Sequence, residues 1–224
     1  MEKKTFYDVL RDRHSCRAFL SREIPADMLI QVLEDAQLSP SNCNTQPWNV
    51  HIVSGLKQQE LSEKLIAAAE QECFSPDFSF DIGDFHGRYK ERQFAQGKIY
   101  YEALGVVRED TEGRKQANIL NYRFYNAPHV AFLFMPSTGD NVRIAGDIGM
   151  YAQTFLLSLT DHGLAGVPQT VLGFFADVVR EHLGISDDFK LLFGISFGYE
   201  DGDAVANTIR MERDAIGENV TFHQ

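Results

Sequence analysis

Hydrophobic residues recur along the chain with two spacings, and each spacing predicts one kind of element. Apolar positions three or four residues apart indicate helices, and this spacing occurs over residues 4–13, 25–36, 56–72, 110–120, 141–162 and 175–183. Short apolar runs indicate strands at 49–54, 127–135 and 189–197, and a further strand is expected at 220–223. The segment 163–170 between two of these elements is expected to be a loop.

The strongest helical pattern covers residues 141–162. Its apolar stripe consists of Ile144, Ile148, Ala152, Phe155, Leu156 and Leu159. Gly146 and Gly149 interrupt it, and glycine allows another backbone to approach closely. We therefore expect a neighbouring element beside these two glycines.

The segment 74–110 is the least regular part of the chain, although it is rich in aromatic residues. These are Phe74, Phe78, Phe80, Phe85, Tyr89, Phe94, Tyr100 and Tyr101. Many aromatic side chains in a segment of weak periodicity suggest a lid or pocket wall. The alternative is an aromatic packing element that covers the core.

Chain length, net charge and cysteine content limit the number of domains, the partners and the compartment that we expect. A chain of 224 residues without a linker-like stretch predicts a single domain spanning 1–224. The formal net charge of −11 argues against nucleic acid as a partner and against a membrane surface. Three scattered cysteines, an N-terminal segment without an apolar signal region, and no apolar run of membrane-spanning length lead us to expect the cytoplasm.

The loop at residues 38–48 is dense in side chains that both donate and accept hydrogen bonds. Its sequence is Leu-Ser-Pro-Ser-Asn-Cys-Asn-Thr-Gln-Pro-Trp. Two prolines stiffen it, and Pro47 is expected to hold Gln46 extended, because the residue before proline avoids helical geometry. Such a loop suits a flat polar ligand. An ordinary helix-to-strand turn would use the same residue types.

A basic segment follows the first helix. Arg13, His14, Ser15 and Arg17 occur within five residues, which is unusual in so acidic a chain. Two guanidinium groups can each present a pair of N–H donors to phosphate. The segment is therefore a candidate anion site, and the alternative is a solvated basic turn. A second arginine pair, Arg210 and Arg213, lies in the C-terminal tail.

Several other chemistries have no sequence support. The chain has no dinucleotide-binding glycine fingerprint after a strand, no G-x-x-x-x-G-K-[ST] phosphate loop and no G-x-S-x-G nucleophile elbow. The histidines lack metal-ligand spacing, so no metal site is expected.

Together, three features of the chain resemble the FMN-dependent nitroreductase family. The family pattern R-x-S-x-R-x-F matches Arg13–Phe19, and A-x-x-x-P-S-x-x-N-x-Q-P-W matches Ala36–Trp48. A strand running into Gly198-Tyr199, followed by the late Arg213, completes the pattern. The resemblance covers essentially the whole chain. The segments 101–110 and 121–128 resemble the nitrobenzoate-reductase-like subfamily more closely.

The resemblance implies a nitroreductase-like α+β fold. In that fold a central, mostly antiparallel sheet is flanked by helices, and two chains form an intertwined homodimer with FMN at the interface. The residues implied to contact FMN are Arg13, His14, Ser15, Arg17, Pro40, Ser41, Asn42, Asn44, Gln46, Pro168, Gln169, Thr170, Arg210 and Arg213.

The resemblance also implies a role for each group. Arg13, Ser15 and Arg213 would hold the phosphate, with His14 beside it and Arg210 as a further cation. Arg17 would lie near N1 and the C2 carbonyl of the flavin, where a cation stabilises the negative charge of the reduced ring. The polar loop would contact the flavin partly from the partner subunit. The backbone of residues 168–170 would line the ring near N5.

The implied activity is reduction of nitroaromatic or similar planar acceptors by NADH or NADPH. The two substrates would occupy the same place in turn, in a ping-pong cycle, and no side chain is assigned as catalytic. Two alternatives stay open at this point. One is a quinone or enone reductase or a reductive dehalogenase on the same fold, and the other is a flavin-binding protein without turnover.

Overall fold

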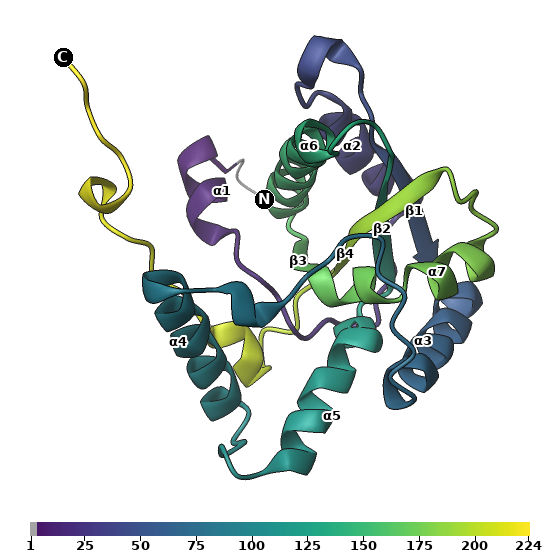
Figure 1. Cartoon of the computed structure of the whole chain (residues 1–224), viewed down its shortest axis with the longest axis vertical. Coiled ribbons are helices and arrows are strands. Elements are labelled where there is room, and N and C mark those ends of the chain that lie inside the picture. The colour runs from purple at the N-terminus through teal and green to yellow at the C-terminus, as the bar shows by residue number, and fades with distance from the viewer. Residues whose placement is uncertain (1–3) are drawn as a thin grey trace.

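A four-stranded antiparallel sheet forms the centre of the protein, in a computed structural model that describes residues 4–224 (Figure 1). Its strand order is β1-β2-β4-β3. The strands are β1 (Asn49–Ser54), β2 (His129–Pro136), β3 (Ala165–Gln169) and β4 (Phe189–Gly198). Residues 1–3, where the expected domain and the N-terminal segment begin, lie outside the described residues. The α+β class and the antiparallel sheet are confirmed.

Helices cover both faces of this sheet. In the described residues they are α1 (Phe6–Asp12), α2 (Ala26–Gln37), α3 (Gly55–Glu70), α4 (Gly87–Ala103), α5 (Thr111–Tyr122), α6 (Val142–Asp161) and α7 (Ala176–Leu183). Side chains next to the first turn cap the N-terminal ends of α1 and α5. Thr5 and Asp8 form a capping box at the start of α1, and Asp110 accepts a hydrogen bond from the Gly113 backbone at the start of α5, at 2.8 Å.

The strand β2 is apolar on both sides because helices cover both of its faces. Side chains alternate along a strand. Ala131, Leu133 and Met135 pack against α2 and α6, whereas the residues between them pack against α3, α7 and the C-terminal end of α5. Figure 1 shows α2 and α6 lying together on one side and α3 and α7 together on the other. The continuous apolar run of β2 is thus a two-sided core strand.

Most predicted elements agree with the structure, and three predictions are wrong. Residues 165–169 form the edge strand β3 rather than a loop. The expected strand at 220–223 is absent, because those exposed residues are irregular, and the tail after residue 209 extends away from the body (Figure 1). The irregular middle segment contains the helix α4, which buries only Tyr100 and therefore shows little periodicity.

The glycines of α6 have no neighbour within the chain. A Cβ atom built on Gly146 or Gly149 would meet no other heavy atom within 4 Å. The expected neighbour is therefore missing among residues 4–224. In the same residues, no helix combines the length and the hydrophobicity needed to cross a membrane.

Candidate functional site

The basic segment after α1 runs along the exposed edge of the sheet. Ser15 forms a parallel bridge with Gly166 of β3, and the Cys16 backbone N–H donates to the Gly166 carbonyl at 3.4 Å. Because β3 is the edge strand, its free side can accept this extra pairing. The segment 13–17 and the segment 165–170, which are distant in sequence, are thus neighbours, as the resemblance implies.

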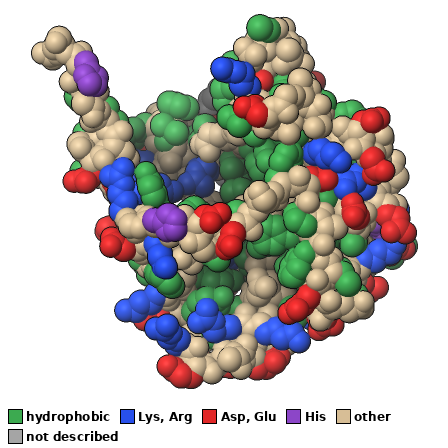
Figure 2. All heavy atoms as spheres, viewed as in Figure 1, with side chains coloured by type: hydrophobic (Ala, Val, Ile, Leu, Met, Phe, Trp, Pro, Cys, Tyr) green, Lys and Arg blue, Asp and Glu red, His purple; other side chains and the backbone are tan. Residues whose placement is uncertain are grey.

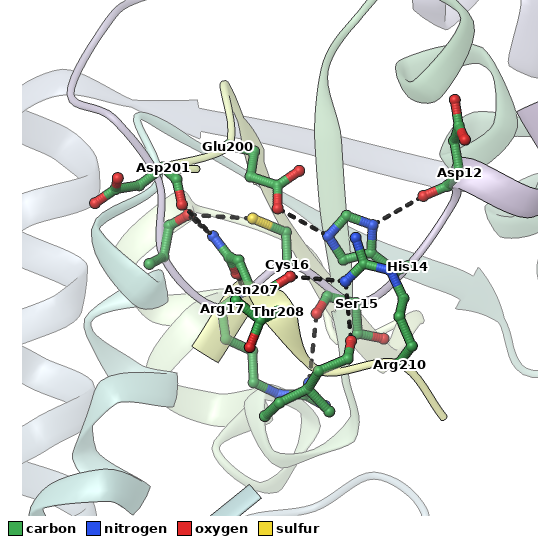
Figure 3. Close-up of polar contacts among 12 residues, drawn as sticks. Asp12, His14, Ser15, Cys16, Arg17, Glu200, Asp201, Asn207, Thr208 and Arg210 are labelled. Atoms are coloured by element: carbon green, nitrogen blue, oxygen red, sulfur yellow. Dashed lines mark hydrogen bonds and ion pairs between the residues drawn. The ribbon is translucent and has the colours of Figure 1, made fainter. Parts of the chain in front are cut away.

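Asn207 fastens the basic segment to the C-terminal tail. Its side chain accepts a hydrogen bond from the Arg17 backbone at 2.7 Å and donates to the carbonyls of Ala18 and Asp201 at 2.8 and 2.9 Å. It is buried, and Figure 3 shows it between the two segments. Sequence reasoning missed this residue, because its partners lie up to 190 positions away and no local motif marks it.

His14 joins the same two parts of the chain. Its Nδ1 lies 2.8 Å from the Asp12 carbonyl oxygen and its Nε2 lies 3.0 Å from Glu200 Oε1. Arg210 lies beside the ring in Figure 3 and donates to the carbonyls of Asn207 and Ile209 at 2.7 and 3.0 Å. His14, Glu200 and Arg210 line a pocket of about 290 Å³.

Arg13 and Arg213 are brought together without a counter-charge. Burial and the positive charge of Arg213 both lower the pKa of Arg13. Within residues 4–224 neither guanidinium forms an ion pair, and Arg213 only donates to the Met211 and Glu212 carbonyls. Two adjacent cations that lack an anion fit a doubly charged phosphate. Figure 2 shows a hollow on this face with basic side chains inside it.

The guanidinium of Arg17 lies over an aromatic ring. Its Cζ is 5.1 Å from the centre of the Tyr100 ring, a cation–π geometry, and its Nη1 donates to the Ser15 carbonyl at 3.4 Å. Arg17 is half-buried, and within the described residues it has no carboxylate partner.

The polar loop 38–48 is exposed and folded on itself. Gln46 has a φ of 47°, so the prediction that it is extended is wrong. Its backbone N–H donates to Ser41 Oγ at 2.9 Å, which closes the loop and outweighs the preference set by Pro47. The Asn42 backbone N–H donates to Asp147 of α6 at 3.1 Å. The side chains of Pro40, Asn42, Asn44 and Gln46 face solvent, and Ser41 is half-buried.

Within one chain, the two parts of the predicted site remain apart. The polar loop lies near α2 and α6, while the basic segment passes beneath α1 toward the tail (Figure 1). No hydrogen bond between described residues connects residues 38–48 with residues 13–17. Each part presents unpaired polar groups, and neither encloses a ligand alone.

The strand β3 presents its predicted site residues to different sides. Pro168 and Thr170 are exposed, and a proline is tolerated there because β3 is an edge strand. The Gln169 side chain points inward instead. Its Nε2 donates to the Asn121 carbonyl at 3.0 Å, and its Oε1 accepts a hydrogen bond from Ser196. Only the backbone of Gln169 is available to a ligand on the outer side.

The described residues contain no cluster of three or more potential metal ligands among histidine, cysteine and acidic side chains. The arginines and the polar loop remain the candidate ligand-binding groups.

Comparison with known proteins gives a consistent result. Residues 10–199 match the Nitroreductase family. The chain is 44% identical to the nitroreductase NfnB of Mycolicibacterium smegmatis, over 96% of this chain and 91% of that protein. It is 31% identical to a 4-nitrobenzoate reductase of Pseudomonas putida, over 93% of this chain and 91% of that protein.

Among solved structures, the fold is similar to the FMN-dependent nitroreductase NfnB from Mycobacterium smegmatis in complex with NADPH. The TM-score is 0.93 at 43% identity, and the match covers 96% of each chain.

Proposed function

The chain belongs to the nitroreductase family, and from that premise we propose that it is an FMN-dependent oxidoreductase that uses NAD(P)H to reduce nitroaromatic or similar planar acceptors. The observation that carries the proposal is the uncompensated pair of cations at Arg13 and Arg213, next to the strand β3. The relatives, which are named nitroreductases and nitrobenzoate reductases, support this reaction over a quinone reductase, a dehalogenase or a flavin carrier.

The residues fit the phosphate end of FMN. Arg13 and Arg213 supply two positive charges, and the exposed face of Ser15 and Arg210 can add hydrogen bonds. His14 orients the segment through its bonds to the Asp12 carbonyl and Glu200. In such a site charge-assisted hydrogen bonds replace the water around the phosphate.

The flavin end requires a second group of residues. Arg17 would lie near N1 and the C2 carbonyl, and the outer face of β3, at Pro168 and Thr170, would line the ring together with the Gln169 backbone. The bound FMN supplies the two-electron chemistry. This chain contributes binding, orientation and a fixed positive charge, so we assign no catalytic side chain.

We propose that the polar loop reaches the flavin from a partner chain in a homodimer. The loop that carries Pro40, Ser41, Asn42, Asn44 and Gln46 bonds to Asp147 of α6 and within itself, and no hydrogen bond between described residues joins it to residues 13–17 of its own chain. The surface also carries large exposed apolar side chains, including Phe6 of α1 and Phe222 of the tail, 71% and 76% exposed. Large exposed apolar side chains of this kind gain free energy when a partner buries them.

The whole chain from 1 to 224 is proposed to act as one domain, with residues 74–110 as the wall of the acceptor pocket. Tyr89 and Phe94 of α4 are 55% and 59% exposed, so they are free to contact an acceptor. Tyr100 differs, because it is buried beneath Arg17. We therefore expect Tyr89→Ala and Phe94→Ala to alter the ratio of kcat/KM values among nitroaromatic acceptors by several-fold, with little change in the rate of flavin reduction by NADPH. Unchanged acceptor ratios in both variants would exclude α4 from the pocket.

One experiment tests the function directly. The purified protein is mixed with FMN and desalted, and its visible absorption spectrum is recorded. We expect about one FMN per chain, and we expect NADPH or NADH to bleach the flavin without oxygen and a nitroaromatic acceptor to restore it. A folded protein that retains no flavin would refute the proposal. A flavin that neither nicotinamide bleaches would support the flavin carrier instead.

A further inference from the structure

Arg17 rests on two buried tyrosines that sequence reasoning did not connect with it. Tyr100 comes from α4 and is 8% exposed, and Tyr125 comes from the turn after α5 and is 4% exposed. Burial raises the pKa of both phenols, while the positive charge of Arg17 opposes that rise in each. The Tyr100 ring centre lies 5.1 Å from Arg17 Cζ, and Tyr125 packs in one buried cluster with Cys16, the residue before Arg17.

Tyr125 occupies a backbone conformation that L-residues rarely adopt. Phe124, Tyr125 and Asn126 have φ values of 54°, 52° and 62°, three left-handed residues in succession. The turn directs Phe124 into the core cluster around α3 and α7, and Tyr125 into a separate cluster with Cys16 and Phe19. Strain of this kind persists only where surrounding contacts hold it, and it concentrates at functional sites.

Two hydrogen bonds from outside the turn hold it in place. The Tyr125 carbonyl accepts a hydrogen bond from the Phe19 backbone at 3.3 Å, which ties the turn to the basic segment. Buried Gln58 donates to the Ala127 carbonyl at 2.7 Å. The turn is thus fixed at both ends, next to Arg17.

A chain of hydrogen bonds continues from the turn into the sheet. The Tyr125 hydroxyl donates to Asn121 Oδ1 at 2.9 Å, Asn121 accepts from Gln169 of β3, and Gln169 accepts from Ser196 of β4. A fully satisfied buried network rigidifies its members. The Tyr125 hydroxyl is therefore tied through Asn121 and Gln169 to the strands β3 and β4.

Tyr100 completes the support from the opposite side. Its ring lies under the guanidinium, and its hydroxyl is buried without a hydrogen-bond partner among the described residues. A buried hydroxyl without a partner carries a free-energy cost. Tyr100 is therefore retained here for another reason, and the contact of its ring with Arg17 supplies one.

We propose that Tyr100 and Tyr125 are positioning residues that hold the Arg17 guanidinium against the pyrimidine side of the bound flavin and thereby raise its reduction potential. The inference rests on the proposed function, which places Arg17 near N1 and the C2 carbonyl. A cation stabilises the reduced flavin only while it is held near the negative charge, so a fixed Arg17 acts more strongly than a mobile one.

The test compares adjacent tyrosines of the same helix. Tyr101 packs beside Tyr100, with ring centres 5.6 Å apart, but it lies beneath a different arginine, with its ring centre 4.6 Å from Arg114 Cζ. We expect Tyr100→Leu to shift the midpoint potential of bound FMN to a more negative value, while Tyr101→Leu leaves it unchanged. A tenfold loss of preference for reduced over oxidised flavin corresponds to about 30 mV for a two-electron couple. Equal potentials in the two variants would overturn the inference.

A double-mutant cycle distinguishes an effect of Tyr100 on the position of Arg17 from a general disruption of the flavin site. Arg17→Gln is expected to lower the potential, and adding Tyr100→Leu to it should lower the potential no further, because both act through one group. Additive shifts would overturn the inference. Tyr100→Phe, which keeps the ring, should retain the wild-type potential, and a shift as large as that of Tyr100→Leu would count against the ring contact.

A second variant covers the case in which Tyr100→Leu does not fold. Tyr125→Phe removes only the hydroxyl that donates to Asn121, and it should also shift the potential to a more negative value. An unchanged potential in Tyr125→Phe would remove Tyr125 from the proposal. Wild-type protein that binds no FMN would instead refute the proposed function, so the two failures are distinguishable.

Discussion

At the scale of single residues, the charge of Arg13 is disfavoured until an anion arrives. Burial and the neighbouring Arg213 both lower its pKa, which means that keeping Arg13 charged costs free energy in the folded chain without ligand. The same arrangement becomes favourable when a phosphate lies between the two guanidiniums. The sign of the effect of Arg13 on stability should therefore depend on FMN.

Replacing Arg13 with Gln tests this reversal. Without FMN, Arg13→Gln should leave the melting temperature unchanged or raise it, because one of two like charges is removed. With FMN, the loss of a charge-assisted contact worth about 1.5–3 kcal/mol should weaken binding roughly tenfold to a hundredfold. Fluorescence titration with FMN and thermal melting measure the two effects. Arg108→Gln, which removes a charge from a residue without an ion pair in the described chain, is the control, and equal effects of both variants would contradict the prediction.

His129 should make stability depend on pH. Its ring is buried against Phe197, with ring centres 5.4 Å apart, and its Nδ1 has no partner within residues 4–224. Burial lowers its pKa, although Glu23 opposes this. Below a pH of about 6.5 the unfolded chain therefore binds a proton that the folded chain does not, so stability falls as the pH is lowered through that range.

Urea unfolding of the wild type and of His129→Gln between pH 7.5 and 5.5 measures this contribution. The wild type should lose more stability over the interval than the variant, with a limiting difference in slope of about 1.4 kcal/mol per pH unit. Parallel pH profiles would show that His129 is not responsible, and that other groups such as His51, whose pKa burial also lowers, account for the slope.

At the scale of elements, the start of the proposed pocket wall is fixed by a buried ion pair. Arg180 of α7 binds Asp77 at 2.5 Å, and Asp77 also accepts a hydrogen bond from the Leu191 backbone at 2.7 Å. Both side chains are almost fully buried, at 7% and 6% exposure. Ser75 pairs with Phe175 immediately before them. Residues 75–77 therefore join the middle segment to α7 and β4.

Removing one partner of this pair should be costly. Asp77→Asn leaves the Arg180 charge buried with only exposed partners, and breaking a buried pair costs about 3–5 kcal/mol. Asp187→Asn removes another carboxylate that pairs with Arg180, at 3.3 Å, but Asp187 is 95% exposed, so it should cost less than about 1 kcal/mol. Chemical denaturation of the two variants compares these costs, and similar losses would disprove the distinction.

Most helices and strands could be predicted from the sequence, whereas β3, α4 and the turn at Tyr125 could not. The strands β1, β2 and β4 and six of the helices follow from periodicity. The helix α1 is the exception in its burial, because it buries only Val9 of its apolar stripe. The strand β3 was not predicted, because Gly166 and Pro168 interrupt its apolar pattern. Residues 165–169 form a strand through their pairing with β4 and with Ser15. The helix α4 was not predicted, because most of it is exposed and it lacks an apolar stripe. The left-handed turn at Tyr125 was not predicted either, because it depends on contacts distant in sequence.

The candidate site was predictable to a similar extent. The arginines and the polar loop are local motifs, and the resemblance to the nitroreductase family rests on these motifs and the spacing between them. Asn207 could not be found this way, and Tyr100 was found only as an aromatic residue of the segment 74–110, because the partners of both lie far away in the chain. The inward orientation of the Gln169 side chain could not be predicted either, because it depends on hydrogen bonds with Asn121 and Ser196.

At the scale of the whole molecule, one chain presents two separate groups of candidate ligand-binding residues. The basic segment and the polar loop do not meet, and the exposed side of α6 between them carries Val142, Gly146, Gly149 and Met150. A helix face with two glycines, and with no neighbour at either glycine among residues 4–224, suits close contact with a second copy. We therefore expect this face of α6 to belong to the dimer interface.

A bulky residue at Gly149 tests this expectation, because its effect has opposite signs in a monomer and in a dimer. Within one chain a Cβ at Gly149 meets nothing within 4 Å, and replacing a helical glycine should stabilise the isolated chain by up to about 1 kcal/mol. In a close interface the Leu side chain would collide with the partner. Sedimentation should show a wild-type dimer and a Gly149→Leu monomer that retains its helical circular dichroism but loses FMN on desalting. Gly149→Ala gains the same helix propensity with a much smaller side chain, so it should stay dimeric and keep its flavin. A dimer that tolerates Leu at Gly149 would place the interface, and the origin of the second half of the site, elsewhere on the surface.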